Sequence, residues 1–147
     1  HDVRAQTPPG HSGMGTTLSA NALALAAMRA TLEHVMTPEA YRHMERLAGL
    51  LAAGLQETIT ARKLPWHVVR VGARVEFVCA PGPLRNGTQA EAAHAPALEQ
   101  AIHLALLNRG CLIAPFHNMM LACPATTETQ VARLLDAFAA VTDSLVS

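Results

Sequence analysis

The 147-residue chain is half apolar and carries eleven basic and eleven acidic side chains, so its formal net charge is zero. This composition predicts a globular domain with a buried core rather than a disordered chain. Balanced charge argues against nucleic acid as a partner, because phosphate backbones attract clustered Lys and Arg.

The chain shows no signal peptide and no apolar run long enough to span a bilayer. Cys79, Cys111 and Cys123 lie in or beside apolar runs, and we expect buried, reduced thiols and a cytoplasmic protein. No His or Cys pair has the spacing of a metal site. The start at His1 suggests a truncated or processed chain.

Residues 1–17 predict a lead-in loop that ends in a phosphate-contacting turn, because Thr16 and Thr17 directly precede a helical run. Backbone N–H groups and a hydroxyl at a helix start bind a phosphate dianion. The alternative is an ordinary Thr or Ser helix cap with no ligand. From Leu18 onward, leucine and methionine among alanines predict a well-buried helix of about four turns.

A second helix is expected to start at Thr37-Pro38-Glu39, where Thr caps, Pro suits the first position and Glu favours the positive helix end. It should run to about Arg62. Apolar side chains three and four residues apart form one stripe for the core. These are Tyr41, Met44, Leu47, Leu51, Leu55 and Ile59.

The apolar period then changes to two, which predicts strands over 66–71 and 74–79 around a tight turn at Gly72 and Ala73. Prolines and glycines predict a loop over 81–88. A third helix is expected over 96–108, stopped by Gly110.

Two more short apolar strands are expected over 111–114 and 119–122, and Thr127 with Gln130 forms a capping box for a last helix to about Leu145. This order predicts an α+β fold: a small, mainly antiparallel sheet of about four short strands with helices on one face, preceded by a long helix.

Phe116, His117 and Asn118 join the last two predicted strands, and they can point into a cleft or form a surface hairpin. Arg70 and Arg74 can form a carboxylate clamp, although strand arginines mostly face solvent. Glu99 and His103, four residues apart on a helix, are expected to form a surface pair.

The motifs together resemble the C-terminal part of class III, fold-type I, pyridoxal-phosphate (PLP) aminotransferases. The nearest branch contains glutamate-1-semialdehyde aminomutases and β-amino-acid or D-phenylglycine aminotransferases. The similarity runs from about His11 to the end and would cover about the last third of a complete enzyme. It is carried by the closing helix and by three motifs: Thr16-Thr17-Leu18-Ser19-Ala20-Asn21-Ala22, Arg70-Val71-Gly72 and Asn108-Arg109-Gly110.

The resemblance implies that residues 18–147 form the C-terminal small domain, without the large PLP-binding domain and its Schiff-base lysine. It places Thr16 and Thr17 at the phosphate of the PLP of the neighbouring subunit in a homodimer. It also places residues 116–118 near the substrate entrance. Thr16, Ala20 and Ala22 depart from the aminomutase pattern, which favours an aminotransferase of another amine.

The only lysine, Lys63, follows the second predicted helix in a surface-like segment. Because PLP chemistry needs a lysine imine, we expect the isolated chain to be inactive. Its parent would transfer an amino group between an amino acid and a keto acid. One alternative is a non-catalytic interaction module that binds a partner through an exposed apolar face. A weaker one is a stand-alone phosphate binder.

Overall fold

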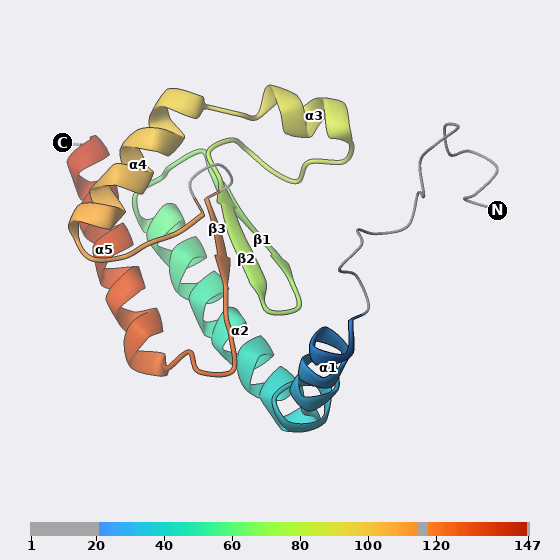
Figure 1. Ribbon diagram of the computed structural model, residues 1–147. Coiled ribbons are helices and arrows are strands. Elements are labelled where there is room, and N and C mark those ends of the chain that lie inside the picture. Colours follow the sequence, from blue (N-terminus) through green and yellow to red (C-terminus); the bar gives the residue numbers. More distant parts are fainter. Residues whose placement is uncertain (1–20, 115–117, 147) are drawn as a thin grey trace, which may run out of the picture. The chain divides into compact units, whose positions relative to one another are not determined.

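The computed structural model describes residues 21–114 and 118–146 of the chain (Figure 1). The chain divides into two compact units, of which residues 38–147 form the larger one. Along the described ranges the elements run α1, α2, β1, β2, α3, α4, β3 and α5. The helices and one small antiparallel sheet form the predicted α+β fold.

Helix α1 spans Ala22–His34, and Asn21 caps it by accepting the Ala24 N–H at 2.9 Å. Because Asn21 has an extended backbone, α1 starts later than the predicted Leu18. No residue of α1 is buried, and Leu23 is 81% exposed. The expectation of a well-buried helix is therefore wrong for this structure. Alanine and leucine predict a helix, but they do not say what packs against it.

Helix α2 spans Pro38–Ala61, close to its predicted bounds. Its apolar stripe is buried from Met44 to Ile59, as the spacing predicted. Tyr41 is the exception, with 47% of its surface exposed in the first turns of the helix.

Strands β1 (His67–Val71) and β2 (Arg74–Val78) form the predicted hairpin. Gly72 in its turn has φ 57°, a left-handed conformation that glycine adopts without strain. Strand β3 (Met119–Leu121) pairs antiparallel with β2, so the sheet order is β1-β2-β3. Residues 111–114 form no strand, and within the described residues the sheet has three strands instead of four.

The two faces of the sheet differ in burial. Val75 and Phe77 of β2 are buried on the face that packs against α2. Cross-strand partners share a face, so Met120, which pairs with Val75, lies on the same side. On the other face Val71 and Leu121 are 72% and 68% exposed.

Helix α4 spans Pro96–Asn108 as predicted, buries Ile102 and Leu106, and ends before Gly110 at φ 75°. The preceding segment contains a short helix, α3 (Gly87–Ala92), which begins inside the predicted loop. Asn86 caps α3 by accepting the Gln89 N–H at 2.9 Å.

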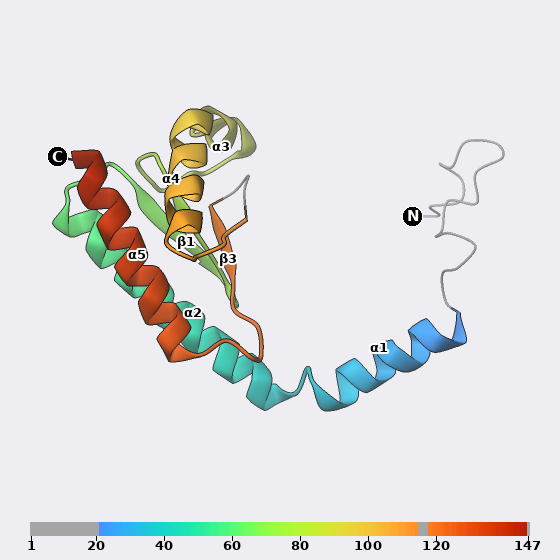
Figure 2. The same ribbon diagram turned by 60° about the vertical axis from the view of Figure 1, so that its left-hand side comes forward.

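Helix α5 spans Glu128–Val146 and begins at the predicted capping box. The Thr127 N–H donates to Gln130 Oε1 at 2.9 Å, and the Gln130 N–H donates to Thr127 Oγ1 at 3.3 Å. Helix α5 lies along α2 and also contacts α4 (Figure 2).

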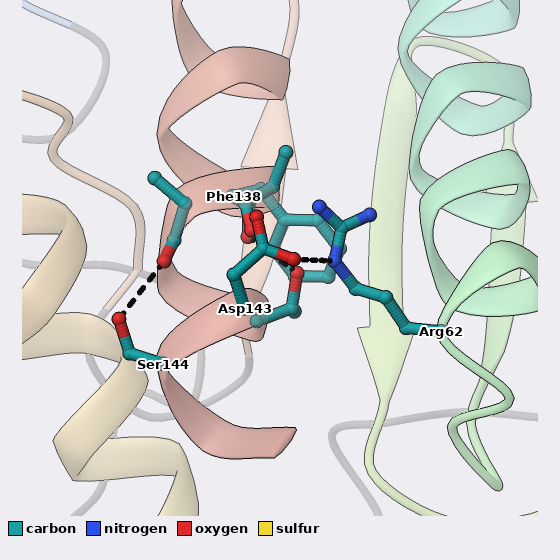
Figure 3. A network of polar contacts seen from close by, with 7 residues as sticks. Arg62, Phe138, Asp143 and Ser144 are labelled. Atoms are coloured by element: carbon teal, nitrogen blue, oxygen red, sulfur yellow. Dashed lines mark hydrogen bonds and ion pairs between the residues drawn. The ribbon is translucent and has the colours of Figure 1, made fainter. Parts of the chain in front are cut away.

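The core lies between the sheet, α2 and α5. Phe138 of α5 is fully buried, and its ring centre lies 4.9 Å from that of Phe77, which stacks on Trp66. At the end of α2, Arg62 pairs with Asp143 of α5 at 2.8 Å (Figure 3). This ion pair near the surface thus joins the first and last helices of the unit.

Candidate functional site

The predicted phosphate ligands Thr16 and Thr17 lie outside the described residues. The described part begins at Asn21, whose side chain accepts one of the amides at the start of α1. The first turn of α1 contains no acidic side chain that would repel a phosphate. The role of the two threonines stays a prediction.

Of the predicted cleft residues, Phe116 and His117 also lie outside the described residues, and Asn118 lies within them. Asn118 is only 4% exposed and has φ 46°, a left-handed conformation that asparagine tolerates better than most residues. Its side-chain nitrogen lies 4.0 Å from Cys79 Sγ. The Asn118 side chain is thus enclosed by the domain and does not project from a surface hairpin.

Asn118 lines a small cavity of about 210 Å³ together with His94 and Glu99. Glu99 Oε1 accepts the Ala95 N–H at 3.1 Å, and Oε2 lies 3.7 Å from His94 Nδ1. Burial, and to a smaller extent the charge of Glu99, raises the pKa of the Cys79 thiol to about 12.

Glu99 therefore pairs with His94 and holds the start of α4. The expectation of a surface pair between Glu99 and His103 is therefore wrong. The spacing of four residues within a helix gave no sign that Glu99 would pair with His94 in the loop before α4. The small cavity was not predicted either. Its residues come from β2, the loop after it, α3, the loop before α4, α4 itself and the segment before β3, and no motif links them.

Arg70 and Arg74 do not form a carboxylate clamp. Arg70 Nη1 donates to the Glu45 carbonyl of α2 at 3.1 Å, whereas Arg74 Nη2 binds Glu76 at 2.7 Å. Arg70 pairs with Val75 in the sheet, so the two arginines lie on opposite faces.

The thiols differ from each other in burial. Cys111 is buried, Cys79 is partly buried and Cys123 is exposed, so the expectation of three buried thiols is wrong for Cys123. It precedes a proline-containing turn, which the apolar run before it did not indicate. In the described ranges no three His, Cys, Asp or Glu side chains lie close enough together to share a metal ion.

A larger hollow lies between residues 110–114, β3, α2 and α5, with a volume of about 700 Å³. We call it the edge groove, because β3 is an edge strand of the sheet. Its described lining is mainly apolar and includes no acidic residue. None of the described helices is long and apolar enough to cross a membrane.

No protein-family model matches this chain. It is 36% identical over 115 residues to a glutamate-1-semialdehyde 2,1-aminomutase of Thermomicrobium roseum. The matched region covers 78% of this chain and 26% of that protein. A solved glutamate-1-semialdehyde aminomutase of Pseudomonas aeruginosa is 47% identical, with a TM-score of 0.87 over 95% of this chain and 32% of its own. The fold also matches a β-phenylalanine aminotransferase of Variovorax paradoxus, with a TM-score of 0.78, 22% identity, and coverage of 97% and 33%.

These likenesses confirm the class that the motifs indicated: the chain is related to a part of class III, PLP-dependent aminotransferases. Within that class, its named sequence relatives are glutamate-1-semialdehyde aminomutases. A lysine-to-alanine variant of the Pseudomonas aeruginosa protein has also been solved in complex with PMP. The chain spans about a third or less of each relative described above.

Proposed function

We propose that the chain is the C-terminal part of a PLP-dependent aminotransferase or aminomutase. Its longer parent would be a cytoplasmic homodimer that transfers an amino group between an amino acid and a keto acid. The observation that carries this proposal is the likeness to the Pseudomonas aeruginosa aminomutase, at 47% identity and a TM-score of 0.87 over 95% of the chain.

Within the parent we assign Thr16 and Thr17 to the phosphate of the neighbouring subunit's PLP, and residues 116–118 to the substrate cleft. The side chain of Asn118 is enclosed by the domain, which supports a role in anchoring residues 116–118 to the domain rather than in contacting substrate. Phe116 and His117 are the members we expect to face the substrate.

The residues of this chain do not fit PLP on their own. Lys63, the only lysine, is exposed and follows α2 with φ 52°. The lysine of a PLP imine is held in a desolvated pocket against the cofactor, and an exposed side chain has no such pocket around it. These observations support the prediction that the isolated chain is inactive.

Titration of the purified chain with PLP tests this prediction. We expect no imine absorbance band beyond that of a chain in which Lys63 is replaced by Arg. A stable band that an amino donor reverses, and that K63R abolishes, would contradict the proposed inactivity.

A graft tests the proposed function itself. This chain would replace the corresponding part of the Pseudomonas aeruginosa aminomutase, and the graft should bind PLP as a dimer. Replacing Thr17 by Ala should weaken cofactor affinity by about tenfold, the typical loss for a charged hydrogen bond. Replacing Thr31, which donates to the Ala27 carbonyl within α1, is the matched control. A folded graft without PLP binding would overturn the proposal.

The alternative of a non-catalytic interaction module draws support from the exposed apolar side chains of α1, such as Leu23 and Leu32. This alternative predicts that the isolated chain binds a separate protein and not the rest of the longer enzyme. The graft separates the two functions, because only the first predicts cofactor binding.

A further inference from the structure

The two edges of the sheet are protected to different degrees. At the β1 edge, Gln56 of α2 accepts the outward N–H of Val68 at 3.2 Å. The β3 edge consists of Met119, Met120 and Leu121, with no charged residue or proline to discourage a further strand. Proteins commonly block exposed sheet edges with charged residues, prolines or a covering element. Strand β3 has no charged residue or proline, so it is the edge more open to pairing.

The register shows which backbone groups of β3 are open. The Ala122 N–H donates to the Ala73 carbonyl of the β2 side at 3.1 Å. Antiparallel pairing alternates, so Met120 directs its N–H and C=O toward β2, whereas Met119 and Leu121 direct theirs away. The Met119 carbonyl accepts the Ala114 N–H at 3.1 Å, but no described residue pairs with the outward N–H or C=O of Leu121.

These open groups belong to a residue that lines the edge groove. Leu121 and Leu112, on the two sides of the groove, are 68% and 76% exposed. An extended peptide in the groove would pair with Leu121 and cover both leucines.

The charge of the groove restricts its occupant. Arg133 of α5 lines it, and its Nη2 donates to the Arg109 carbonyl at 3.4 Å. No described carboxylate pairs with it, and among the described arginines that lack such a pair it is the one that lines the edge groove. A segment with an acidic side chain beside its apolar residues complements this lining.

A second copy of this chain does not fit the open edge. Twofold pairing of two β3 strands through Leu121 would bring together two grooves whose described linings contain no acidic residue. Neither groove would then supply a carboxylate to the Arg133 of the other, whereas a segment of different sequence can do so. The solved Pseudomonas aeruginosa relative, of which this chain covers 32%, has about two thirds of its polypeptide outside the matched part.

We propose that the edge groove is a docking surface for an extended segment of the parent polypeptide, from the part outside this chain. The segment pairs with the backbone of Leu121, covers Leu112 and Leu121 with apolar side chains, and places a carboxylate against Arg133. This inference rests on the proposed function, because it takes the occupant from the longer enzyme.

Overlapping peptides of about ten residues, enough for one strand, would be made from the remaining part of the Pseudomonas aeruginosa aminomutase. Each would be titrated into the isotopically labelled chain while the amide resonances of Gly110, Leu112 and Leu121 are followed. We expect a peptide with alternating apolar residues and one acidic residue to shift these resonances. R133E and L121K should each weaken its binding by about tenfold, whereas R42E, at an exposed arginine outside the groove, should not.

The inference is overturned if no peptide shifts the Leu121 amide, or if R133E leaves the affinity of the binding peptide unchanged. A shift that depends on the concentration of the chain alone would point to self-association and would also overturn it. Cofactor binding by the graft decides the proposed function separately. If the graft binds PLP but no peptide binds the chain, the inference about the edge groove fails and the proposed function stands.

Discussion

At the scale of single residues, the thiols of Cys79 and Cys123 have opposite environments. Burial raises the pKa of Cys79 to about 12, whereas the Thr126 hydroxyl, 3.4 Å from Cys123 Sγ, and nearby backbone amides lower the pKa of Cys123. Because the thiolate is the nucleophile, iodoacetamide at about pH 8 should modify Cys123 first and Cys79 only after unfolding. Peptide mass spectrometry measures both rates. Faster modification of Cys79 in the folded chain would contradict the structure.

The ion pair between Arg62 and Asp143 gives stability a defined pH dependence. Its hydrogen bond to Arg62 holds the pKa of the Asp143 carboxyl below its usual value. The stabilisation is therefore present above the unfolded pKa of about 4 and is lost as pH falls through the lower folded value.

The effect should be small, because most of the Asp143 side chain is exposed and salt screens such pairs. D143N should lower the urea midpoint slightly at about pH 7 and by less at about pH 3, because the carboxyl takes up a proton as the pH falls. An equal loss at both pH values would mean that the pair does not act through charge.

At the scale of elements, Gly54 of α2 leaves room for Leu135 of α5. A Cβ atom there would lie 2.5 Å from Leu135 Cδ1, so Leu135 would have to move. Gly54→Ala should therefore cost about 1–3 kcal/mol through overpacking, less the gain of up to about 1 kcal/mol in helix propensity.

Gly49 on the same helix provides the matched control. A Cβ there meets only Arg70 Nη1, at 4.0 Å, so Gly49→Ala should stabilise the chain by up to about 1 kcal/mol. Urea denaturation measures both variants, and L135A should restore much of the loss in Gly54→Ala. A stabilised Gly54→Ala variant would show that the helices adjust without cost.

Local chemistry made the helix bounds and the hairpin predictable. The capping box at Thr127, the proline at the start of α2 and Gly72 in the turn act within a few residues of themselves. Residues 111–114 have the same apolar character as a strand, but a strand also needs a partner along its length, and sequence does not supply that.

The site was less predictable than the fold, because it depends on contacts between distant segments. The motif around Asn118 left open whether this segment points into a cleft or forms a surface hairpin. The burial of Asn118 depends on neighbours such as Cys79 and Glu99 from elsewhere in the chain. The edge groove had no signal at all, since its two sides carry ordinary apolar residues. The sequence also cannot show that Arg133 lacks an ion-pair partner, because this depends on where the carboxylates lie in the folded chain.

At the scale of the whole molecule, the described buried residues all lie between Met44 and Thr142. We therefore expect a chain shortened to residues 38–147 to keep the unfolding midpoint of the full chain. It should also be more soluble, because it loses the exposed Leu23, Met28 and Leu32. Differential scanning calorimetry and the solubility limit of both chains test this. A large drop in midpoint would show that residues 1–37 help to hold the core.

The joining of α2 to α5 also has a consequence for synthesis on the ribosome. Arg46 and Glu128, like Arg62 and Asp143, stand 82 and 81 positions apart, so the chain must close a long loop before these contacts form. The apolar stripe of α2 leaves the ribosome before α5 does, so α5 can cover it only after the segment between them has been made. Translation that stops before Glu128 releases a product in which the apolar stripe of α2 lacks its α5 cover. Such a product is prone to aggregate and is a substrate for chaperones and proteases.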